Sequence, residues 1–228
     1  MHLLAHRGHH TNLPENTMEA FASALTLGFE GIETDVRLTR DQHLVLFHNR
    51  VLGNGIAVAE LTRAELQSAV GYPVPTLEEA LDAFPSALWN IEIKVVAAQA
   101  DSIAVLKRYQ HNRRLLVTSF RHDIVQACAH ELSVDCGMLV AHRPVSINSL
   151  AHAALPEPRL RTIVWDFEIV DVQQLEMANS IGFKNVVYGA HTQDEHELCA
   201  HFGLHGLITD HPEFIDLPHR GLHSQTKH

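Results

Sequence analysis

Carboxylate and amino side chains recur at a spacing of two within the first hundred residues of the chain. Glu33 and Asp35 lie between apolar neighbours, and Glu92 and Lys94 repeat this spacing further along. Residues two apart on a β-strand point to the same side of the sheet. Three converging carboxylates, with room for water, suit a hard divalent cation such as Mg²⁺ or Ca²⁺, which takes oxygen ligands. The pattern therefore predicts a metal site made by Glu33, Asp35 and Glu92.

Two histidines and two cationic residues complete the candidate site. His6 and Arg7 directly follow one apolar run, and His48 follows another. Arg7 and Lys94 would face an anion on the metal, because guanidinium binds phosphate with two donors and ammonium acts as a point charge. One neutral and one protonated imidazole can divide the base and acid roles near neutral pH. A metal, cationic groups, an acid and a base together favour phosphoryl transfer over acyl transfer.

Each of these signals is weak by itself. The chain has 19 histidines in 228 residues, so His48 alone carries little information. A Glu-x-Asp pair on a strand is more often a solvated edge, and Glu92 with Lys94 is also what a surface ion pair looks like. The joint pattern is more specific, because the motifs follow one another in order and each stands at the end of an expected strand.

The elements that must position these side chains alternate between two kinds along most of the chain. Short β-type runs alternate with amphipathic segments, which predicts parallel strands joined by crossover helices. The expected strands are His2–Ala5, Gly31–Val36, Leu44–Phe47, Leu88–Ile93, Leu115–Ser119, Cys136–Val140, Thr162–Trp165, Asn185–Tyr188 and Gly206–Ile208. The expected helical segments include Thr17–Leu27, Ser102–Gln110, His122–Glu131, Val172–Ser180 and Glu195–His201, and capping boxes start helices at Thr62 with Glu65 and at Thr76 with Glu79.

The number of strands decides between two architectures. Leu44–Phe47 follows Gly31–Val36 too closely for a crossover helix, so both belong to one interrupted strand or to a hairpin. Eight βα units remain, which predicts a single-domain (β/α)₈ TIM barrel over residues 1–217. The rival is a doubly wound open sheet, but no GxGxxG or GxxxxGK[ST] motif follows any strand. Residues at about 49–73 are expected to form a small excursion after the second strand, and residues 218–228 a flexible tail.

Composition limits the classes of protein that the chain can represent. A length of 228 residues suits one domain, and the formal net charge of −10 argues against a nucleic-acid partner. The three cysteines are far apart, which indicates structural thiols in a reducing compartment. No signal sequence or membrane span is recognisable, so we expect a cytoplasmic protein without stable membrane insertion. An oligomer remains open.

A series of short motifs spans nearly the whole chain. They read Ala5-His6-Arg7-Gly8, Pro14-Glu15-Asn16-Thr17 with Ala20-Phe21, Ile32-Glu33-Thr34-Asp35-Val36, Thr39-x-Asp41, His48, Leu61-Thr62-x-x-Glu65-Leu66, Pro75-Thr76-Leu77-Glu78-Glu79, Asn90-Ile91-Glu92-Ile93-Lys94, Ser119-Phe120 and Gly206-Leu207-Ile208-Thr209-Asp210-x-Pro212. In these motifs the sequence resembles the glycerophosphodiester phosphodiesterase family, and the first hundred residues carry the most specific of them.

The resemblance implies a TIM-barrel enzyme of lipid and glycerol metabolism that cleaves glycerophosphodiesters, a small-molecule substrate, to sn-glycerol 3-phosphate and an alcohol. It implies an acid/base pair of His6 and His48, Mg²⁺ or Ca²⁺ ligands Glu33, Asp35 and Glu92, and phosphate contacts from Arg7 and Lys94. In the family's proposed mechanism a glycerol hydroxyl attacks phosphorus, and water then opens a cyclic phosphate. Glu15 and Asn16 are expected to shape their loop and cap the next helix.

The sequence departs from the family pattern at two places. His48 is followed by Asn49 where the family usually has aspartate, and an asparagine can orient the imidazole only by hydrogen bonding. Residues 188–191 read Tyr-Gly-Ala-His where the family often has Trp-Thr-Val-Asn, so substrate preference is expected to differ. We expect Trp165 and Tyr188 to pack in the barrel more than to stack on substrate.

Two alternative functions remain open at this point. One is a phosphodiesterase of the lysophospholipase D type, which needs an apolar groove at the barrel mouth. The other is a barrel that binds phosphodiesters without catalysis, which the loss of a metal ligand or a histidine would favour. No such loss is found among the seven candidate site residues.

Overall fold

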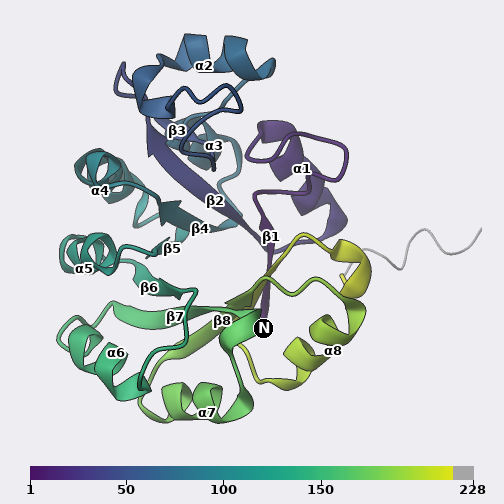
Figure 1. Cartoon of the computed structure of the whole chain (residues 1–228), viewed down its shortest axis with the longest axis vertical. Helices are drawn as coiled ribbons and strands as arrows, with labels where there is room; N and C mark the ends of the chain where they lie inside the picture. The colour runs from purple at the N-terminus through teal and green to yellow at the C-terminus, as the bar shows by residue number, and fades with distance from the viewer. Residues whose placement is uncertain (218–228) are drawn as a thin grey trace, which may run out of the picture.

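The computed structural model describes residues 1–217, so the tail expected at 218–228 lies outside the described residues. Eight parallel strands form a closed barrel ringed by helices (Figure 1). In order around the barrel they are β1 (His2–His6), β2 (Gly31–Leu38), β4 (Leu88–Ile93), β5 (Arg114–Ser119), β6 (Asp135–Val140), β7 (Leu160–Asp166), β8 (Lys184–Tyr188) and β9 (Gly206–Thr209). Strand β1 pairs with both β2 and β9, which closes the sheet. The predicted (β/α)₈ barrel is confirmed, and the open-sheet rival is excluded.

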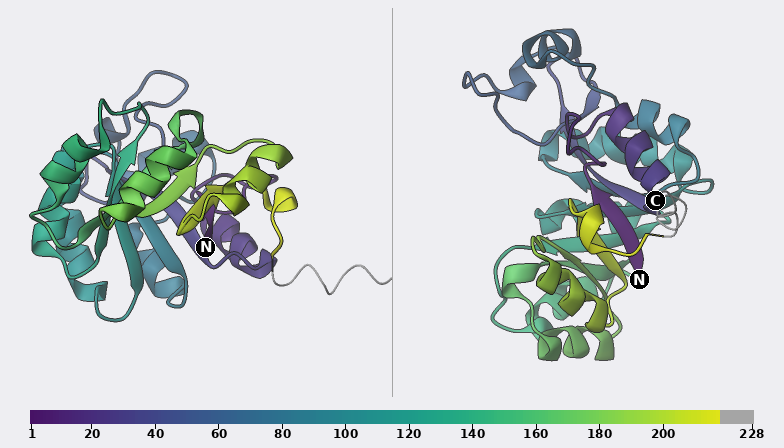
Figure 2. Two further views of the ribbon diagram at one scale, coloured as in Figure 1. Left: turned by 90° about the horizontal axis from the view of Figure 1, so that it is seen from below. Right: turned by 90° about the vertical axis from the view of Figure 1, so that its right-hand side faces the viewer.

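A short ninth strand, β3 (Leu44–Leu46), resolves the surplus in the predicted count. It pairs antiparallel with the end of β2, with Val36 opposite Leu46. The hairpin interpretation is therefore correct, and the chain leaves the barrel at this point. Beyond β3 lie the short helix η1 (Val58–Glu60) and the helix α2 (Arg63–Val70), which project at one end of the molecule (Figures 1 and 2). The next helix, α3 (Leu77–Ala83), packs on the barrel, with Leu77, Ala80 and Leu81 in the main core.

The helices begin where the capping signals place them. Both predicted capping boxes are present, at Thr62 with Glu65 and at Thr76 with Glu79, and each satisfies backbone N–H groups that the first helical turn leaves free. The remaining helices are α1 (Met18–Leu27), α4 (Gln99–Tyr109), α5 (His122–Glu131), α6 (Ile147–Ala154), α7 (Val172–Ser180) and α8 (Gln193–His201), with short helices η2 (Val96–Ala98), η3 (Phe167–Ile169) and η4 (Pro212–Phe214). No helix among the described residues is long and apolar enough to cross a membrane.

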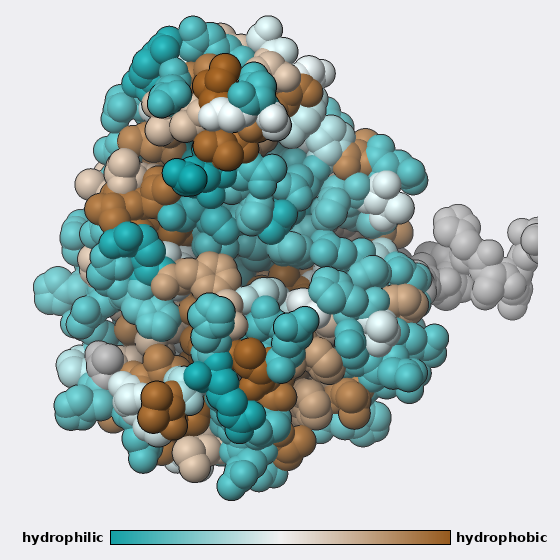
Figure 3. Space-filling view, viewed as in Figure 1, coloured by the Kyte–Doolittle hydropathy of each residue, from teal (hydrophilic) through white to brown (hydrophobic). Residues whose placement is uncertain are grey.

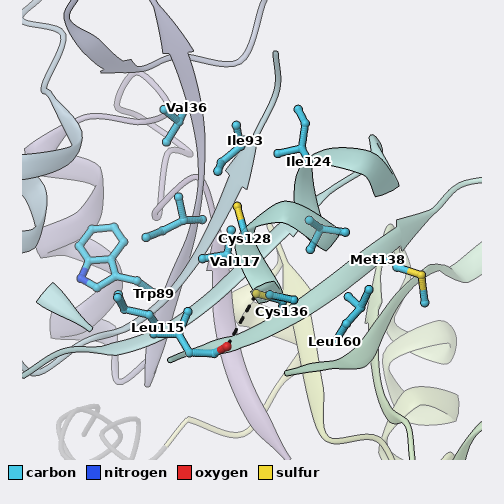
Figure 4. Packing of buried hydrophobic residues seen from close by; sticks show 14 of the residues in the cluster. Val36, Trp89, Ile93, Leu115, Val117, Ile124, Cys128, Cys136, Met138 and Leu160 are labelled. Atoms are coloured by element: carbon cyan, nitrogen blue, oxygen red, sulfur yellow. Dashed lines mark hydrogen bonds between the residues drawn. The ribbon is translucent and has the colours of Figure 1, made fainter. Parts of the chain in front are cut away.

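The main core lies outside the strands, between the barrel and its helices. Figure 4 shows Trp89, Ile93 and Val117 packed there with Cys128 and Cys136, and all are buried. The three cysteines are buried and unpaired, and burial raises the pKa of the Cys128 thiol to about 12. They are therefore packing residues with inert thiols, as expected.

The inside of the barrel changes character along the strands. A small apolar cluster fills its lower part, with residues such as Leu4, Val186 and Ile208. Two positions further along the same three strands stand His6, Tyr188 and, just past the last of them, Asp210. Because residues two apart share a face, each strand carries packing at its start and chemistry at its end. The candidate site must therefore lie at the carboxyl ends of the strands.

Candidate active site at the carboxyl end of the barrel

The structure brings the three predicted carboxylates together. Glu33 and Asp35 lie on β2 and Glu92 on the neighbouring β4, where Asp35 stands directly opposite Glu92. One carboxylate oxygen from each residue lies within 4.8 Å of the others. All three side chains are buried, with at most 6% of each residue exposed. Two parallel strands in register thus turn a spacing of two into a compact cluster of oxygen donors.

The cluster carries more negative charge than its surroundings neutralise. Burial, together with the charges of Asp35 and Glu92, raises the pKa of Glu33 well above its usual value. Burial also raises the pKa of Glu92 to about 7. One oxygen of Glu33, Oε2, is buried without a hydrogen-bond partner. A divalent cation would supply the missing charge and coordinate the orphaned oxygen, so the donor set fits Mg²⁺ or Ca²⁺.

Lys94 and Arg7 both contact the cluster. Lys94 Nζ lies 2.9 Å from a Glu92 oxygen and 3.2 Å from Asp35 Oδ1, while Arg7 Nε lies 3.1 Å from Asp35 Oδ2. Burial opposes ionisation of Asp35, but Lys94 and Arg7 outweigh it and hold the pKa of Asp35 below its usual value. Arg7 also donates to Glu15 at 2.8 Å. Both cationic groups face the cavity that holds the carboxylates.

The loop after β1 is bent sharply to place Arg7. Arg7 has a φ of 57° and Gly8 a φ of 83°, in the left-handed region that side chains with a Cβ rarely adopt. A Cβ on Gly8 would lie 2.7 Å from the backbone of Ala20, so only glycine fits against α1. The Arg-Gly pair therefore has a structural reason: the chain turns within one residue of the strand end and returns the guanidinium to the site.

The expectation that Glu15 and Asn16 cap the next helix is wrong. Thr17 is the N-cap of α1, and its side chain accepts a hydrogen bond from the Ala20 N–H. Asn16 instead donates to Asp35 Oδ2 at 2.9 Å and accepts from the Thr34 hydroxyl at 2.6 Å. Asn16 is buried, and like Arg7 it has a left-handed backbone. It fixes the orientation of a predicted metal ligand.

His6 is held by a residue that sequence analysis did not select. His6 Nδ1 lies 3.0 Å from both carboxylate oxygens of Asp210, and His10 Nε2 lies 2.9 Å from one of them. An ionised carboxylate can only accept, so the proton of His6 is on Nδ1 and its Nε2 faces the cluster, 3.9 Å from Glu33. Burial opposes ionisation of Asp210, but the hydrogen bonds from His10 and His6 hold its pKa well below the usual range.

His48 stands on the other side of the same cavity with a different partner. Its Nδ1 lies 3.0 Å from Asn49 Oδ1, which is the orienting contact expected of an asparagine. The backbone carbonyl of His48 accepts a 2.7 Å hydrogen bond from Arg37 Nε. Burial lowers the pKa of His48, which favours the neutral imidazole. The structure thus brings six of the seven predicted site residues to the lining of one cavity, and the seventh, Asp35, is buried in contact with Arg7 and Lys94.

The cavity has a volume of about 360 Å³ and two unlike walls. One wall carries Glu33, Glu92, both histidines, Arg7 and Lys94. The other carries His191 together with apolar, aromatic and acidic residues, among them Phe120, Leu139, Asp166, Glu168 and Tyr188. Hydrophilic side chains border a central hollow on the face of the molecule seen in Figure 3.

Both aromatic residues of the barrel pack against apolar neighbours, as expected. Trp165 is fully buried and donates to the side chain of Asn185. Tyr188 packs on the apolar cluster inside the barrel, and it also lines the cavity with Gly189, Ala190 and His191 and meets Phe120 edge to face. The stretch that departs from the family motif therefore contributes to the pocket.

Comparisons with known proteins agree with the geometry. The model of the glycerophosphoryl diester phosphodiesterase family matches residues 6–214. The glycerophosphodiester phosphodiesterase of Caldanaerobacter subterraneus is 30% identical over 96% of this chain and 98% of its own length. The crystal structure of the Thermotoga maritima glycerophosphodiester phosphodiesterase superposes with a TM-score of 0.80 at 25% identity, covering 92% of this chain and 95% of that one. An Oleispira antarctica phosphodiesterase in complex with sn-glycerol 3-phosphate shares the fold, with a TM-score of 0.80 at 22% identity over 93% of this chain and 94% of that one.

Proposed function

Since the chain belongs to the glycerophosphoryl diester phosphodiesterase family, we propose that it hydrolyses glycerophosphodiesters to sn-glycerol 3-phosphate and an alcohol, with a divalent cation on Glu33, Asp35 and Glu92 and with His6 and His48 as acid and base. The chain is an enzyme of this family, so the alternative of a barrel that only binds phosphodiesters falls away. The product would return to glycerol and lipid metabolism.

One observation carries the proposal. Three buried carboxylates lie within 4.8 Å of one another, and the cavity beside them also holds two histidines that are oriented by different partners, His6 at the end of β1 and His48 two residues past β3. The buried, unpartnered oxygen of Glu33 supports a cation in this place rather than a structural ion-pair network. A bound Mg²⁺ or Ca²⁺ would polarise the phosphoryl oxygens and offset their charge.

The side chains of the cavity provide the remaining requirements. Arg7 and Lys94 present positive charge to an anionic phosphodiester in the same space. Asp210 keeps the proton of His6 on Nδ1, so Nε2 can take a proton from a hydroxyl or return one to a leaving alcohol. Asn49 orients the ring of His48 in the same way without adding charge.

The proton transfers then balance between the two imidazoles. One takes the proton of the glycerol hydroxyl next to the phosphoester as its oxygen attacks phosphorus. The other gives its proton to the departing alcohol oxygen. The two roles are exchanged when water opens the resulting cyclic phosphate, which leaves sn-glycerol 3-phosphate and restores both histidines.

The direct test is the release of glycerol 3-phosphate from glycerophosphocholine and glycerophosphoethanolamine, with and without EDTA. We expect release that EDTA stops and that added Mg²⁺ or Ca²⁺ restores. Release that continues unchanged in EDTA would rule out the metal role, and normal turnover by both Glu92→Gln and His48→Ala would show that the site is misplaced.

A further inference from the structure

A second hollow shares no lining residue with the catalytic cavity and has no part in the proposed chemistry. It is a groove of about 520 Å³ between the excursion after β3 and the turn that follows β4. Its lining combines apolar residues, Val58 and Val95 among them, with three arginines, Arg37, Arg40 and Arg50. Three guanidinium groups in one groove are unusual in a chain whose formal net charge is −10.

Arg37 is the most informative of the three. Only 9% of the residue is exposed, and its Nε donates to the carbonyl of His48. No carboxylate among residues 1–217 lies within ion-pair distance of Arg37. A buried guanidinium without an anionic partner is costly, so its remaining donors are available to an anion in the groove.

Arg50 adds a second uncompensated charge to the same groove. It is exposed, and its side chain makes no ion pair within the described part of the chain. Arg40 differs, because its guanidinium already contacts the Glu65 carboxylate and the Glu60 carbonyl. Arg37 and Arg50 therefore form a candidate anion-binding site. Arg40 lines the same groove but is already paired, so it serves as an internal control.

The residues that line the groove are close neighbours of the catalytic residues in the sequence. Arg37 holds the peptide of His48, Arg50 follows it by two residues, and Val95 directly follows Lys94. We propose that Arg37 and Arg50 bind a second anionic group of the substrate, a phosphate monoester carried by the alcohol of the glycerophosphodiester. This inference rests on the proposed function and assigns a preference to it: alcohols that bear a phosphate over neutral ones.

Arg37 also has a purely structural explanation, as a support for the loop that carries His48. The two explanations differ in how they depend on the substrate. Loss of a structural support lowers the turnover of every ester alike. Loss of an anion contact lowers kcat/KM only for the ester that carries the second phosphate, and mainly through KM, because the contact is made in ground and transition states equally.

The test uses two substrates that differ by one phosphate, glycerophosphoinositol and glycerophosphoinositol 4-phosphate. We expect the wild-type enzyme to have the higher kcat/KM for the phosphorylated ester. Arg50→Gln, which changes an exposed side chain, should lower that value about fivefold and leave glycerophosphoinositol unchanged, the size of one partly exposed charge contact. Arg40→Gln should change neither substrate, and Arg37→Lys should weaken the preference while keeping a charge.

The possible results separate this inference from the proposed function. Wild-type enzyme that cleaves both esters equally well would overturn the second anion site alone. So would an Arg40→Gln variant that loses as much selectivity as Arg50→Gln. Failure to release glycerol 3-phosphate from any glycerophosphodiester, glycerophosphocholine included, would instead overturn the proposed function and this inference with it.

Discussion

The two histidines of the cavity are held in different ways. His6 bonds to both oxygens of Asp210, which lies 204 residues away along the chain. His48 bonds to Asn49, its immediate neighbour. One imidazole is supported by a charge from the opposite end of the chain, and the other by a neutral amide on its own loop. An imidazole can therefore be oriented either by a contact that forms when the barrel closes or by the next residue in the sequence.

The difference has an electrostatic consequence. A carboxylate beside a histidine stabilises the imidazolium, whereas an amide only fixes the direction of the ring. Burial lowers the pKa of His48, and Asn49 adds no charge to oppose that effect. Substitution of Asp210 and substitution of Asn49 should therefore affect activity to different degrees. Loss of the carboxylate cluster should affect the function of both histidines equally.

The largest effect is expected from a substitution in the carboxylate cluster, on which both histidines depend. Glu92→Gln takes one oxygen donor from the cluster and should lower kcat/KM on the order of 10³-fold, since metal catalysis contributes several kcal/mol. EDTA should act on the wild type in the same way. Glycerol 3-phosphate release measures both effects, and Glu78→Gln, a surface carboxylate paired with Arg108, is the matched control. Equal activity of the two variants would contradict the shared site.

Alanine at either histidine should come next, with a loss of roughly 10²- to 10⁴-fold in kcat. The two variants should part when the leaving alcohol is replaced by a nitrophenol, which departs without needing a proton. The variant that lacks the acid then regains activity, and the variant that lacks the base does not. His9→Ala, whose ring contacts Ser23, is the control. Two variants that respond alike to the nitrophenyl ester would show that the roles are not divided.

A smaller effect should separate the two partners. Asp210→Asn replaces the charged acceptor of His6 and should lower kcat about 10- to 100-fold, as for other residues that orient a functional group. Asn49→Ala should cost only a few-fold, because it removes a neutral contact. A fall in kcat with an unchanged KM and an unchanged melting temperature distinguishes a positioning role of Asp210 from damage to the fold. Equal losses of kcat in Asp210→Asn and Asn49→Ala would show that the charge of the histidine's partner does not matter for catalysis.

The smallest expected effect comes from giving His48 a carboxylate partner like that of His6. Asn49→Asp places a carboxylate beside His48 and should raise its depressed pKa, because the imidazolium gains a negative neighbour. If His48 is the base, the acid limb of the pH profile of kcat/KM moves to higher pH. If it is the acid, the alkaline limb moves to higher pH. A profile identical to that of the wild type would show that the partner's charge does not set this pKa.

Sequence patterns were sufficient where the determinants are local. The spacing of Glu33, Asp35 and Glu92 follows from strand geometry, and the capping boxes follow from residue types three apart. The extra strand could be recognised from the short link before Leu44, because parallel strands need a longer connection. The barrel and the grouping of its seven candidate site residues were therefore within reach of the sequence.

The features that the sequence did not reveal depend on closure or on side-chain direction. Asp210 meets His6 only because β9 pairs with β1, and the available signal was an acid immediately after the last strand. Asn16 was expected at a helix start, but a left-handed backbone turns it toward Asp35 instead. Tyr188 packs as expected, but its position two residues past Val186 also places it in the cavity. Nothing in a one-dimensional pattern states which contacts the last strand will make.

The pairing of β9 with β1 also orders events during synthesis on the ribosome. The predicted metal ligands and both histidines have emerged once β4 is complete, but the acceptor that orients His6 emerges more than a hundred residues later. Contacts so distant in sequence form late, because loop closure must precede them. Enzymatic activity should therefore arise abruptly as the nascent chain closes its barrel. A turnover assay on stalled chains of increasing length would thus report when the two edges of the sheet meet.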